Sequence, residues 1–146
     1  MTNIRVMTIQ DFDQIYNIWI NTPGMGLNTT DDSKAGIEKY LKRNPTTSFV
    51  AEDGDKIIGA IMAGHDGRRG YIHHTFVLPE YRKQGIAQIL VNSAIDALDK
   101  EGINKVALVA FKENKGGNAF WERIGFTARN DLFYRNKNIH ELNPIE

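Results

Sequence analysis

A strand, a long helix and a second strand follow one another directly between residues 71 and 111, and this unit constrains the fold most. Residues 71–78 (YIHHTFVL) and 105–111 (KVALVAF) have the apolar composition of strands, the second of them buried. Between them, residues 82–101 carry apolar residues at helical spacing, and Gly102 follows where a helix-ending glycine belongs. Such a unit places its two strands parallel, through a right-handed crossover.

The remaining segments supply further strands and helices around this unit. Hydrophobic patterning predicts four more strands, at residues 3–9, 48–52, 56–63 and 126–135. Helical spacing predicts three more helices, one opening at Thr8 or Asp11, one capped by residues 31–33 and ending near Arg43, and one at about 116–124. The predicted fold class is α/β: one mixed, mostly antiparallel sheet with helices on both faces, in a single domain spanning residues 1–146.

Composition excludes several classes of function. The 18 basic and 18 acidic residues balance, whereas a nucleic-acid-binding protein usually has a basic excess. The absence of cysteine excludes disulfides, thiolate metal sites and a cysteine nucleophile. The four histidines lack ligand spacing, so no metal site is predicted. No apolar run has the roughly 20 residues of a membrane span, and no signal peptide is recognised, so a cytoplasmic protein is expected.

The turn after residue 78 has the features of an anion-binding site. A strand ends at Leu78, a short turn follows, and the predicted helix opens around Gly85. The first turn of a helix offers unpaired N–H groups and the positive end of the helix dipole. Gly85 lets a phosphate approach the backbone, and Arg82 and Lys83 add positive charge. These features suit a diphosphate, although an ordinary helix N-terminus with a solvated basic pair would look the same.

A second segment, residues 114–126 (NKGGNAFWERIGF), follows the predicted strand at 105–111. Its small residues Gly116, Gly117 and Ala119 would allow a ligand to approach closely. The alternative is a short amphipathic helix whose aromatic residues, Phe120 among them, only fill the core.

Together the two segments resemble the GNAT superfamily, the Gcn5-related N-acetyltransferases. Residues 77–87 (VLPEYRKQGIA) resemble its pyrophosphate motif, and residues 114–126 resemble its second coenzyme A motif. The spacing between the motifs and the order of elements match as well, from the first strand to Tyr134. The resemblance implies a GNAT-like fold and an acetyl-coenzyme A-dependent transferase that acetylates an amine without an acyl-enzyme.

The resemblance also implies where acetyl-coenzyme A binds. The strand that precedes the pyrophosphate helix would splay from its neighbour, and pantetheine would fill the gap, hydrogen-bonded to backbone near Phe76, Val77 and Leu78. The diphosphate would meet the backbone of residues Arg82, Lys83, Gln84, Gly85, Ile86 and Ala87. The second motif would contact the coenzyme A arm through Asn114, Gly117 and Phe120.

The transfer needs a base for the amine, an N–H donor for the oxyanion and an acid for the departing thiolate. His73 and His74 are the candidate bases. Strand alternation places them on opposite faces, so at most one would serve. The resemblance favours His73, although both could be structural. Trp121 stands where many members have tyrosine, so Tyr134 on the last strand is the candidate acid, or else a packing residue.

The acceptor site is expected at loop 21–30, the start of the second helix and the end of the sheet. Met25 and Leu27 suggest apolar contacts there. Asp31, Asp32 and Glu38 could attract a cation, but they are equally good helix-cap and surface charges. The favoured acceptor is a primary amine of a small molecule, and a protein or peptide amine is the alternative. A non-catalytic coenzyme A-binding module is a further alternative, whereas a nucleotide-binding domain is disfavoured because no GxxxxGK[ST] loop is present. Exposed strand edges could support a homodimer.

Overall fold

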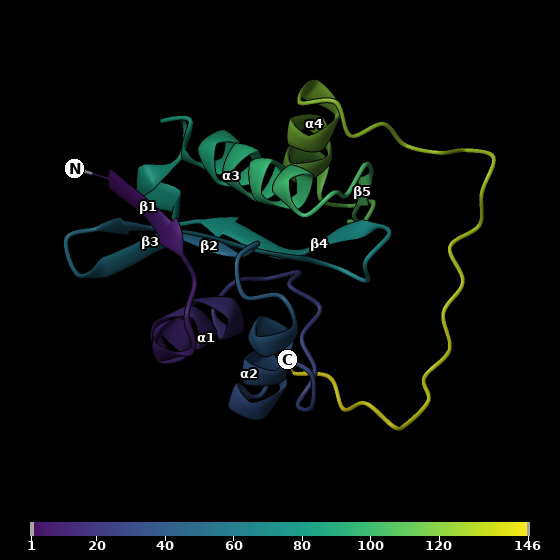
Figure 1. Cartoon of the computed structure of the whole chain (residues 1–146), viewed down its shortest axis with the longest axis horizontal. Helices are drawn as coiled ribbons and strands as arrows, with labels where there is room; N and C mark the ends of the chain where they lie inside the picture. Colours follow the sequence, from purple (N-terminus) through teal and green to yellow (C-terminus); the bar gives the residue numbers. More distant parts are fainter. Residues whose placement is uncertain (1, 146) are drawn as a thin grey trace.

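A computed structural model describes residues 2–145, which build one five-stranded sheet between two layers of helices (Figure 1). In spatial order the strands are β1 (Thr2–Val6), β2 (Phe49–Asp53), β3 (Lys56–His65), β4 (Gly70–Val77) and β5 (Val106–Ala107). The first four strands pair antiparallel, and β5 pairs parallel to β4. The predicted mixed, mostly antiparallel sheet and its parallel strand–helix–strand unit are confirmed.

The helices divide between the two faces of the sheet, as Figure 1 shows. On one face lie α1 (Phe12–Ile20) and α2 (Lys34–Arg43), and on the other lie α3 (Ile86–Lys100) and α4 (Lys115–Arg123). Short 3₁₀ turns, η1 (Ile9–Asp11) and η2 (Pro79–Tyr81), precede α1 and α3. No helix within the described part of the chain is long and apolar enough to cross a membrane.

The predicted cap residues hold the first two helices by different bonds. The Asp11 carboxylate accepts a hydrogen bond from Thr8 N–H at 2.8 Å, which closes the turn ahead of α1. The same carboxylate accepts hydrogen bonds from Arg5 Nη1 at 2.9 Å and from Arg5 Nη2 at 2.7 Å. At α2, Ser33 Oγ accepts from Gly36 N–H at 3.0 Å. Of the predicted capping run 31–33, Ser33 alone is the N-cap, which leaves Asp32 available for another partner.

Two buried clusters lie on opposite faces of the sheet because side chains alternate along its strands. The α1 and α2 face is filled by Met7, Ile15, Trp19, Leu27, Ile37, Leu41, Val50, Ile57, Ala60, Met62 and Phe76. The α3 and α4 face is filled by Ala51, Ile58, Ile61, Ala63, Ile72, Val77, Ile86, Leu90, Val91 and Ala94. The apolar stripe predicted for the long helix is therefore its core-facing side.

A β-bulge interrupts this alternation in the middle of β4. Ile61 pairs with Thr75 and Ala63 pairs with Ile72, so the single residue Met62 lies opposite both His73 and His74. The His74 ring contacts Trp19 of α1, and the His73 ring contacts Tyr40 of α2. Both histidines therefore face the α1 and α2 layer. The prediction of opposite faces is wrong because the extra residue shifts the phase of the strand by one.

Three predicted elements differ from the structure. The long helix begins at Ile86, since residues 82–85 form a loop, rather than at residue 82. The predicted strand at 105–111 pairs only at Val106–Ala107, and its later part is exposed instead of buried. The predicted last strand at 126–135 is absent. A strand-like composition is not sufficient for a strand, because the backbone must also pair with a neighbouring strand. In the described chain, residues 108–111 and 126–135 pair with no strand.

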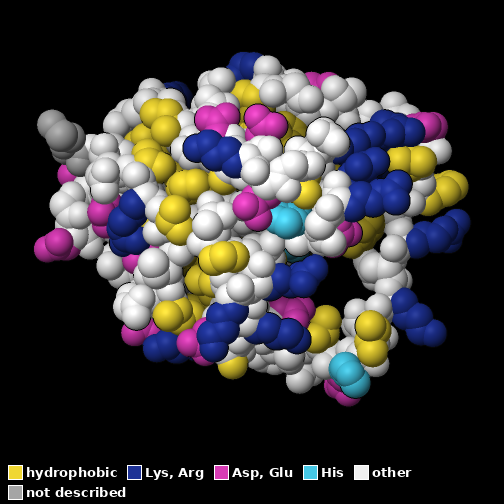
Figure 2. Space-filling view, viewed as in Figure 1, with side chains coloured by type: hydrophobic (Ala, Val, Ile, Leu, Met, Phe, Trp, Pro, Cys, Tyr) yellow, Lys and Arg dark blue, Asp and Glu magenta, His cyan; other side chains and the backbone are white. Residues whose placement is uncertain are grey.

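The segment after α4 crosses open space before it returns to the molecule (Figure 1). The space-filling view shows it standing off the body, with hydrophobic side chains along it (Figure 2). Phe133 and Ile139 are 86% and 91% exposed. Near its end the segment meets the loop between α1 and α2, where Ile145 N–H donates to Leu27 O at 3.0 Å and Thr29 N–H donates to Asn143 O at 2.8 Å.

Two adjacent residues of α3 provide a test of its packing. Leu90 is 0% exposed and lies between α3 and the sheet, whereas Ile89 is 47% exposed. Leu90→Ala should lower the free energy of unfolding by about 2–5 kcal/mol, because it leaves a cavity in the core. Ile89→Ala should change it by less than about 1 kcal/mol. Urea denaturation of both variants measures the difference, and equal losses would contradict this assignment of the two helix faces.

Candidate active site

The candidate site begins where β4 separates from β5. The two strands pair only through Gly70 with Val106 and Tyr71 with Ala107, so β4 continues for six residues without a partner on that edge. Its other edge remains paired with β3 as far as Val77. The splayed strand expected from the GNAT resemblance is thus present, and backbone groups of β4 are open to a ligand along this edge.

The backbone of Val77 directs its polar groups to the open edge. Leu78 N–H donates to Ile58 O of β3 at 2.8 Å, so it is already used on the β3 side. Successive residues of a strand direct their N–H and C=O groups to alternate edges, so those of Val77 point away from β3. The Val77 carbonyl accepts a hydrogen bond from Arg82 Nε at 3.0 Å. Among the expected residues Phe76, Val77 and Leu78, Val77 is therefore the one whose N–H can reach a ligand.

The loop before α3 presents a run of unpaired N–H groups. Among residues 2–145, none accepts a hydrogen bond from the backbone N–H groups of residues 83–88. Lys83 and Gly85 both have left-handed backbone conformations, with φ of 64° and 79°. Left-handed residues at the turn into a helix can direct successive N–H groups toward a common point, so residues 82–88 form a candidate anion-binding loop. A left-handed lysine is itself a sign of a functional loop, because that conformation is strained for residues with a side chain.

The side chains of this loop divide into two groups. Arg82, Lys83 and Gln84 are exposed, although Arg82 folds back so that its Nε reaches the Val77 carbonyl. Ile86 is 4% exposed and belongs to the α3 core, so only its backbone is available to a ligand. Gly85 has no protein atom within 4 Å of where a Cβ would stand. The loop therefore combines open backbone donors with two cations, as the sequence predicts.

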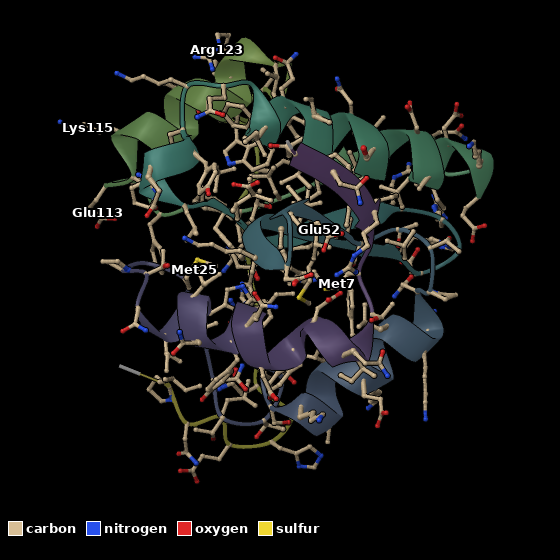
Figure 3. All side chains as sticks on the ribbon, turned by 90° about the vertical axis from the view of Figure 1, so that its left-hand side faces the viewer. Met7, Met25, Glu52, Glu113, Lys115 and Arg123 are labelled. Atoms are coloured by element: carbon tan, nitrogen blue, oxygen red, sulfur yellow. The ribbon has the colours of Figure 1, made fainter. Side chains whose placement is uncertain are left out.

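In the second motif, Asn114 and Gly117 have a structural role. Asn114 Oδ1 accepts from Gly117 N–H at 3.0 Å and caps α4. A Cβ on Gly117 would lie 2.5 Å from Asn114 Nδ2, so the capping side chain would have to shift to accommodate it. Phe120 is half-buried and packs against Trp121, with ring centroids 5.1 Å apart. Figure 3 places Lys115, in the first turn of α4, at the edge of the molecule. Contacts of Asn114, Gly117 and Phe120 with coenzyme A remain a prediction.

Two hollows lie on either side of residues 21–23. The first, about 270 Å³, is lined by residues of α1, by residues 76–79 and by Arg82. The second, about 410 Å³, is lined by residues 19–27 and Ile145. Residues Asn21, Thr22 and Pro23 line both and form a shared wall. Figure 3 shows Met25, one of the residues that line the second hollow, at the level between the sheet and α1. The open edge of β4 and the predicted acceptor loop thus adjoin.

The two histidines of the bulge have different surroundings. His73 lies between two tyrosines, with ring centroids 5.4 Å from Tyr40 and 4.7 Å from Tyr71. Desolvation in this crowded position lowers the pKa of His73, and the charge of His74 lowers it further. His74 is more enclosed, and its Nε2 lies 2.7 Å from Asp32 Oδ1, a carboxylate that is 5% exposed.

The structure does not bring Tyr134 into a strand. It is 67% exposed on the segment that follows α4, so the placement expected for it on a last strand is wrong. Trp121 packs between Phe120 and Phe126, with both centroid distances 5.1 Å, and lies partly buried against the α3-side core. The assignment of Tyr134 as the acid stays a prediction without a supporting contact.

Sequence reasoning misses Asp32 and Trp19 as neighbours of the candidate base. It predicts for Asp32 a part in capping α2 or in attracting a cationic acceptor, and for Trp19 a place in the core. The sole local signal is a pair of carboxylates ahead of Ser33, where one cap residue suffices. Within residues 2–145, no three His, Asp or Glu side chains gather in a way that could hold a metal ion.

Comparisons with known proteins cover nearly the whole chain. Residues 12–126 match the sequence model of the acetyltransferase (GNAT) family. The acetyltransferase SG1711 of Sodalis glossinidius (strain morsitans) is 28% identical over 138 residues, which are 94% of this chain and 96% of that protein. The crystal structure of a possible acetyltransferase from Clostridium difficile 630 is 27% identical, with a TM-score of 0.70, over 96% of this chain and 99% of that one.

A more distant relative shares the fold. The PaiA N-acetyltransferase of Thermoplasma acidophilum, crystallised in complex with coenzyme A, superposes with a TM-score of 0.75 at 18% identity. The superposition covers 90% of this chain and 93% of that one.

A pair of glycines at the two ends of α3 tests the anion-binding loop. Gly85 and Gly102 have φ of 79° and 81°, and at neither would an added Cβ meet another atom within 4 Å. Alanine at either site should cost roughly 1–2 kcal/mol of stability, because both conformations are left-handed. Only Gly85→Ala should also weaken coenzyme A binding, by about tenfold or more, equivalent to about 1.4 kcal/mol. Calorimetric titration of both variants measures this, and equal affinities would contradict the assignment.

Proposed function

The chain belongs to the acetyltransferase (GNAT) family, and we propose that it transfers the acetyl group of acetyl-coenzyme A directly to the primary amine of a small molecule. Dependence on acetyl-coenzyme A and acetyl transfer follow from the family and from the relatives that match along the whole chain. The nature of the acceptor, the direct route and the roles of individual residues are the proposal.

The open edge of β4 and the loop before α3 support the proposed placement of the cofactor. Pantetheine would lie along the unpaired edge, where the Val77 N–H and carbonyl are directed. The diphosphate would take up the N–H groups of residues 83–88, with Arg82 and Lys83 beside it. Arg82 Nε would then exchange its bond to the Val77 carbonyl for the phosphates. Asn114, Gly117 and Phe120 would form the more distant part of the site.

The second hollow is the observation that favours a small acceptor. Its volume of about 410 Å³ lies within the usual range for small-molecule sites. Its lining includes Met25, Leu27 and Ile145 and contains no charged side chain. A small amine with an apolar body fits such a lining better than a polycation, which would lack counter-charges. A peptide or protein amine remains the second candidate, because the hollow is open to the surface.

The proposed chemistry follows from the groups around the end of β4. The amine nitrogen attacks the thioester carbonyl, and the developing oxyanion is stabilised by the Val77 N–H. No cysteine is available to form an acyl-enzyme. The base is His73 or His74, and the bulge directs both toward the α1 and α2 face of the sheet. The thiolate takes up a proton as it leaves, either from Tyr134 or from the protonated base, directly or through water.

The proposal is tested by two assays in sequence. Calorimetric titration with acetyl-coenzyme A should show binding to one site per chain. Thiol release should then be followed over a panel of apolar monoamines, polyamines, amino acids and short peptides. We expect turnover with apolar monoamines above that with polyamines or peptides, because the acceptor lining carries no charge.

Each outcome has a distinct reading. Preferred turnover of peptides would assign a protein or peptide acceptor, and turnover of polyamines would contradict the apolar acceptor. An acetyl adduct on the protein itself, detected by intact mass after acetyl-coenzyme A alone, would contradict direct transfer. Binding without turnover on any amine would favour a coenzyme A-binding module over this proposal.

A further inference from the structure

The contact between His74 and Asp32 reaches beyond the cofactor site and concerns the proton transfer itself. We propose that Asp32 is the positioning residue of a histidine–aspartate pair, which fixes His74 in the tautomer whose Nδ1 accepts the proton of the acceptor amine. This inference rests on the proposed function. Asp32 immediately precedes Ser33, the N-cap of α2, 42 residues before His74 in the chain, and the bulge of β4 turns His74 toward it.

The tautomer of His74 follows from the chemistry of its partner. His74 Nε2 and Asp32 Oδ1 are 2.7 Å apart, and an ionised carboxylate can only accept hydrogen bonds. Nε2 must therefore carry the proton. In the neutral ring, Nδ1 is then the nitrogen with the lone pair. The other carboxylate oxygen, Oδ2, accepts from the backbone N–H of Asn28 at 2.8 Å, so both oxygens of Asp32 are held.

The surroundings protect the pair but leave Nδ1 accessible. Asp32 is 5% exposed, and Trp19, which is 1% exposed, meets the imidazole edge to face with centroids 4.8 Å apart. Within residues 2–145, no group donates a hydrogen bond to His74 Nδ1. Nδ1 is nevertheless not among the buried side-chain atoms that lack a partner, which in this part of the chain are Trp19 Nε1 and Tyr40 Oη. Nδ1 therefore retains contact with solvent, as a base must in the absence of substrate.

The position of His74 along β4 suits a role at the thioester. It precedes Val77 by three residues, which is about 10 Å along a strand. Phe76, two residues on, shares its face and lines the hollow beside the open edge. That distance accommodates an amine nitrogen between the thioester carbonyl and Nδ1, with one water in the path. His73 lies one residue further away, and no side chain holds its ring by a hydrogen bond in the described part of the chain.

The proposed step balances without a further reactant. As the neutral amine nitrogen bonds to the carbonyl carbon, its proton passes to His74 Nδ1, directly or through one water. The resulting imidazolium is stabilised by the Asp32 carboxylate at Nε2. The carbon–sulfur bond then breaks with its electron pair on sulfur, and the imidazolium returns the proton to the thiolate, directly or through water. The products are the acetylated amine, coenzyme A and neutral His74.

Asp32→Asn tests the tautomer directly, because the backbone N–H of Asn28 fixes the orientation of the new side-chain amide. The Asn28 N–H can only donate, so the amide oxygen should stay toward it and the amide NH₂ should face His74 Nε2. An NH₂ donor would force the opposite tautomer, with the proton on Nδ1. We expect kcat/KM for the amine to fall by about a hundredfold or more, the range attributed to general bases. The ¹⁵N shifts of His74 should report a protonated Nδ1.

Asp31→Asn is the matched control. It removes the same charge one residue earlier, but Asp31 is exposed and its carboxylate contacts Asn28 Nδ2 rather than His74. Its kcat/KM should stay within about threefold of the wild-type value, since exposed charges contribute little. Its His74 shifts should be unchanged. Thermal unfolding of both variants checks that they are folded.

The outcomes separate this inference from the proposed function. A wild-type protein that acetylates no amine would refute the proposed function. An active wild type whose folded Asp32→Asn variant keeps its kcat/KM would refute the role of Asp32 alone. The ¹⁵N shifts of His74 in the wild-type protein need no variant, and a proton on Nδ1 there would overturn the proposed tautomer.

Discussion

The structure depends on the unequal pairing of the two edges of β4. Along one edge β4 is hydrogen-bonded to β3, and along the other it meets β5 for only two residues. A paired strand in mid-sheet has no backbone groups to offer a ligand, whereas an unpaired one buried in a protein leaves them unsatisfied. β4 holds its position through β3 and keeps the Val77 N–H unpaired at the open edge, where the Val77 carbonyl accepts a hydrogen bond from Arg82 Nε. The anion-binding loop, the hollows and the bulge are all placed relative to this strand.

The local part of the site could be predicted from the sequence because its signals are local. The candidate anion-binding loop depends on Gly85, on the cations beside it and on the helix that follows, all within a few residues. The same holds for Ser33 as a cap and for the apolar stripe of α3. Each of these features is a property of a short segment whose conformation is set by its own composition.

The rest of the site depends on contacts that no short segment contains. At the bulge, the single residue Met62 of the neighbouring strand lies opposite both His73 and His74. Alternation along β4 alone would place one of the two histidines on the opposite face of the sheet. The bond between Asp32 and His74 joins residues 42 positions apart. The expected last strand at 126–135 fails for the same reason, since strand composition is present but no partner is found in the described chain. Sequence patterning describes segments well and their mutual arrangement poorly.

Ile145, at the end of the segment after α4, forms part of the wall of the second hollow, where we propose that the acceptor binds. Ile145 reaches that wall at the end of an exposed stretch that includes Leu132 and Phe133, and it is held by few backbone bonds. Its residence there relies on the high effective concentration that an intact covalent tether provides. A single proteolytic nick near Phe133 would leave the sheet and the anion-binding loop in place but turn this wall into a weakly bound separate peptide. On the proposed function, limited proteolysis would alter which acceptors are used and leave the proposed cofactor site unchanged.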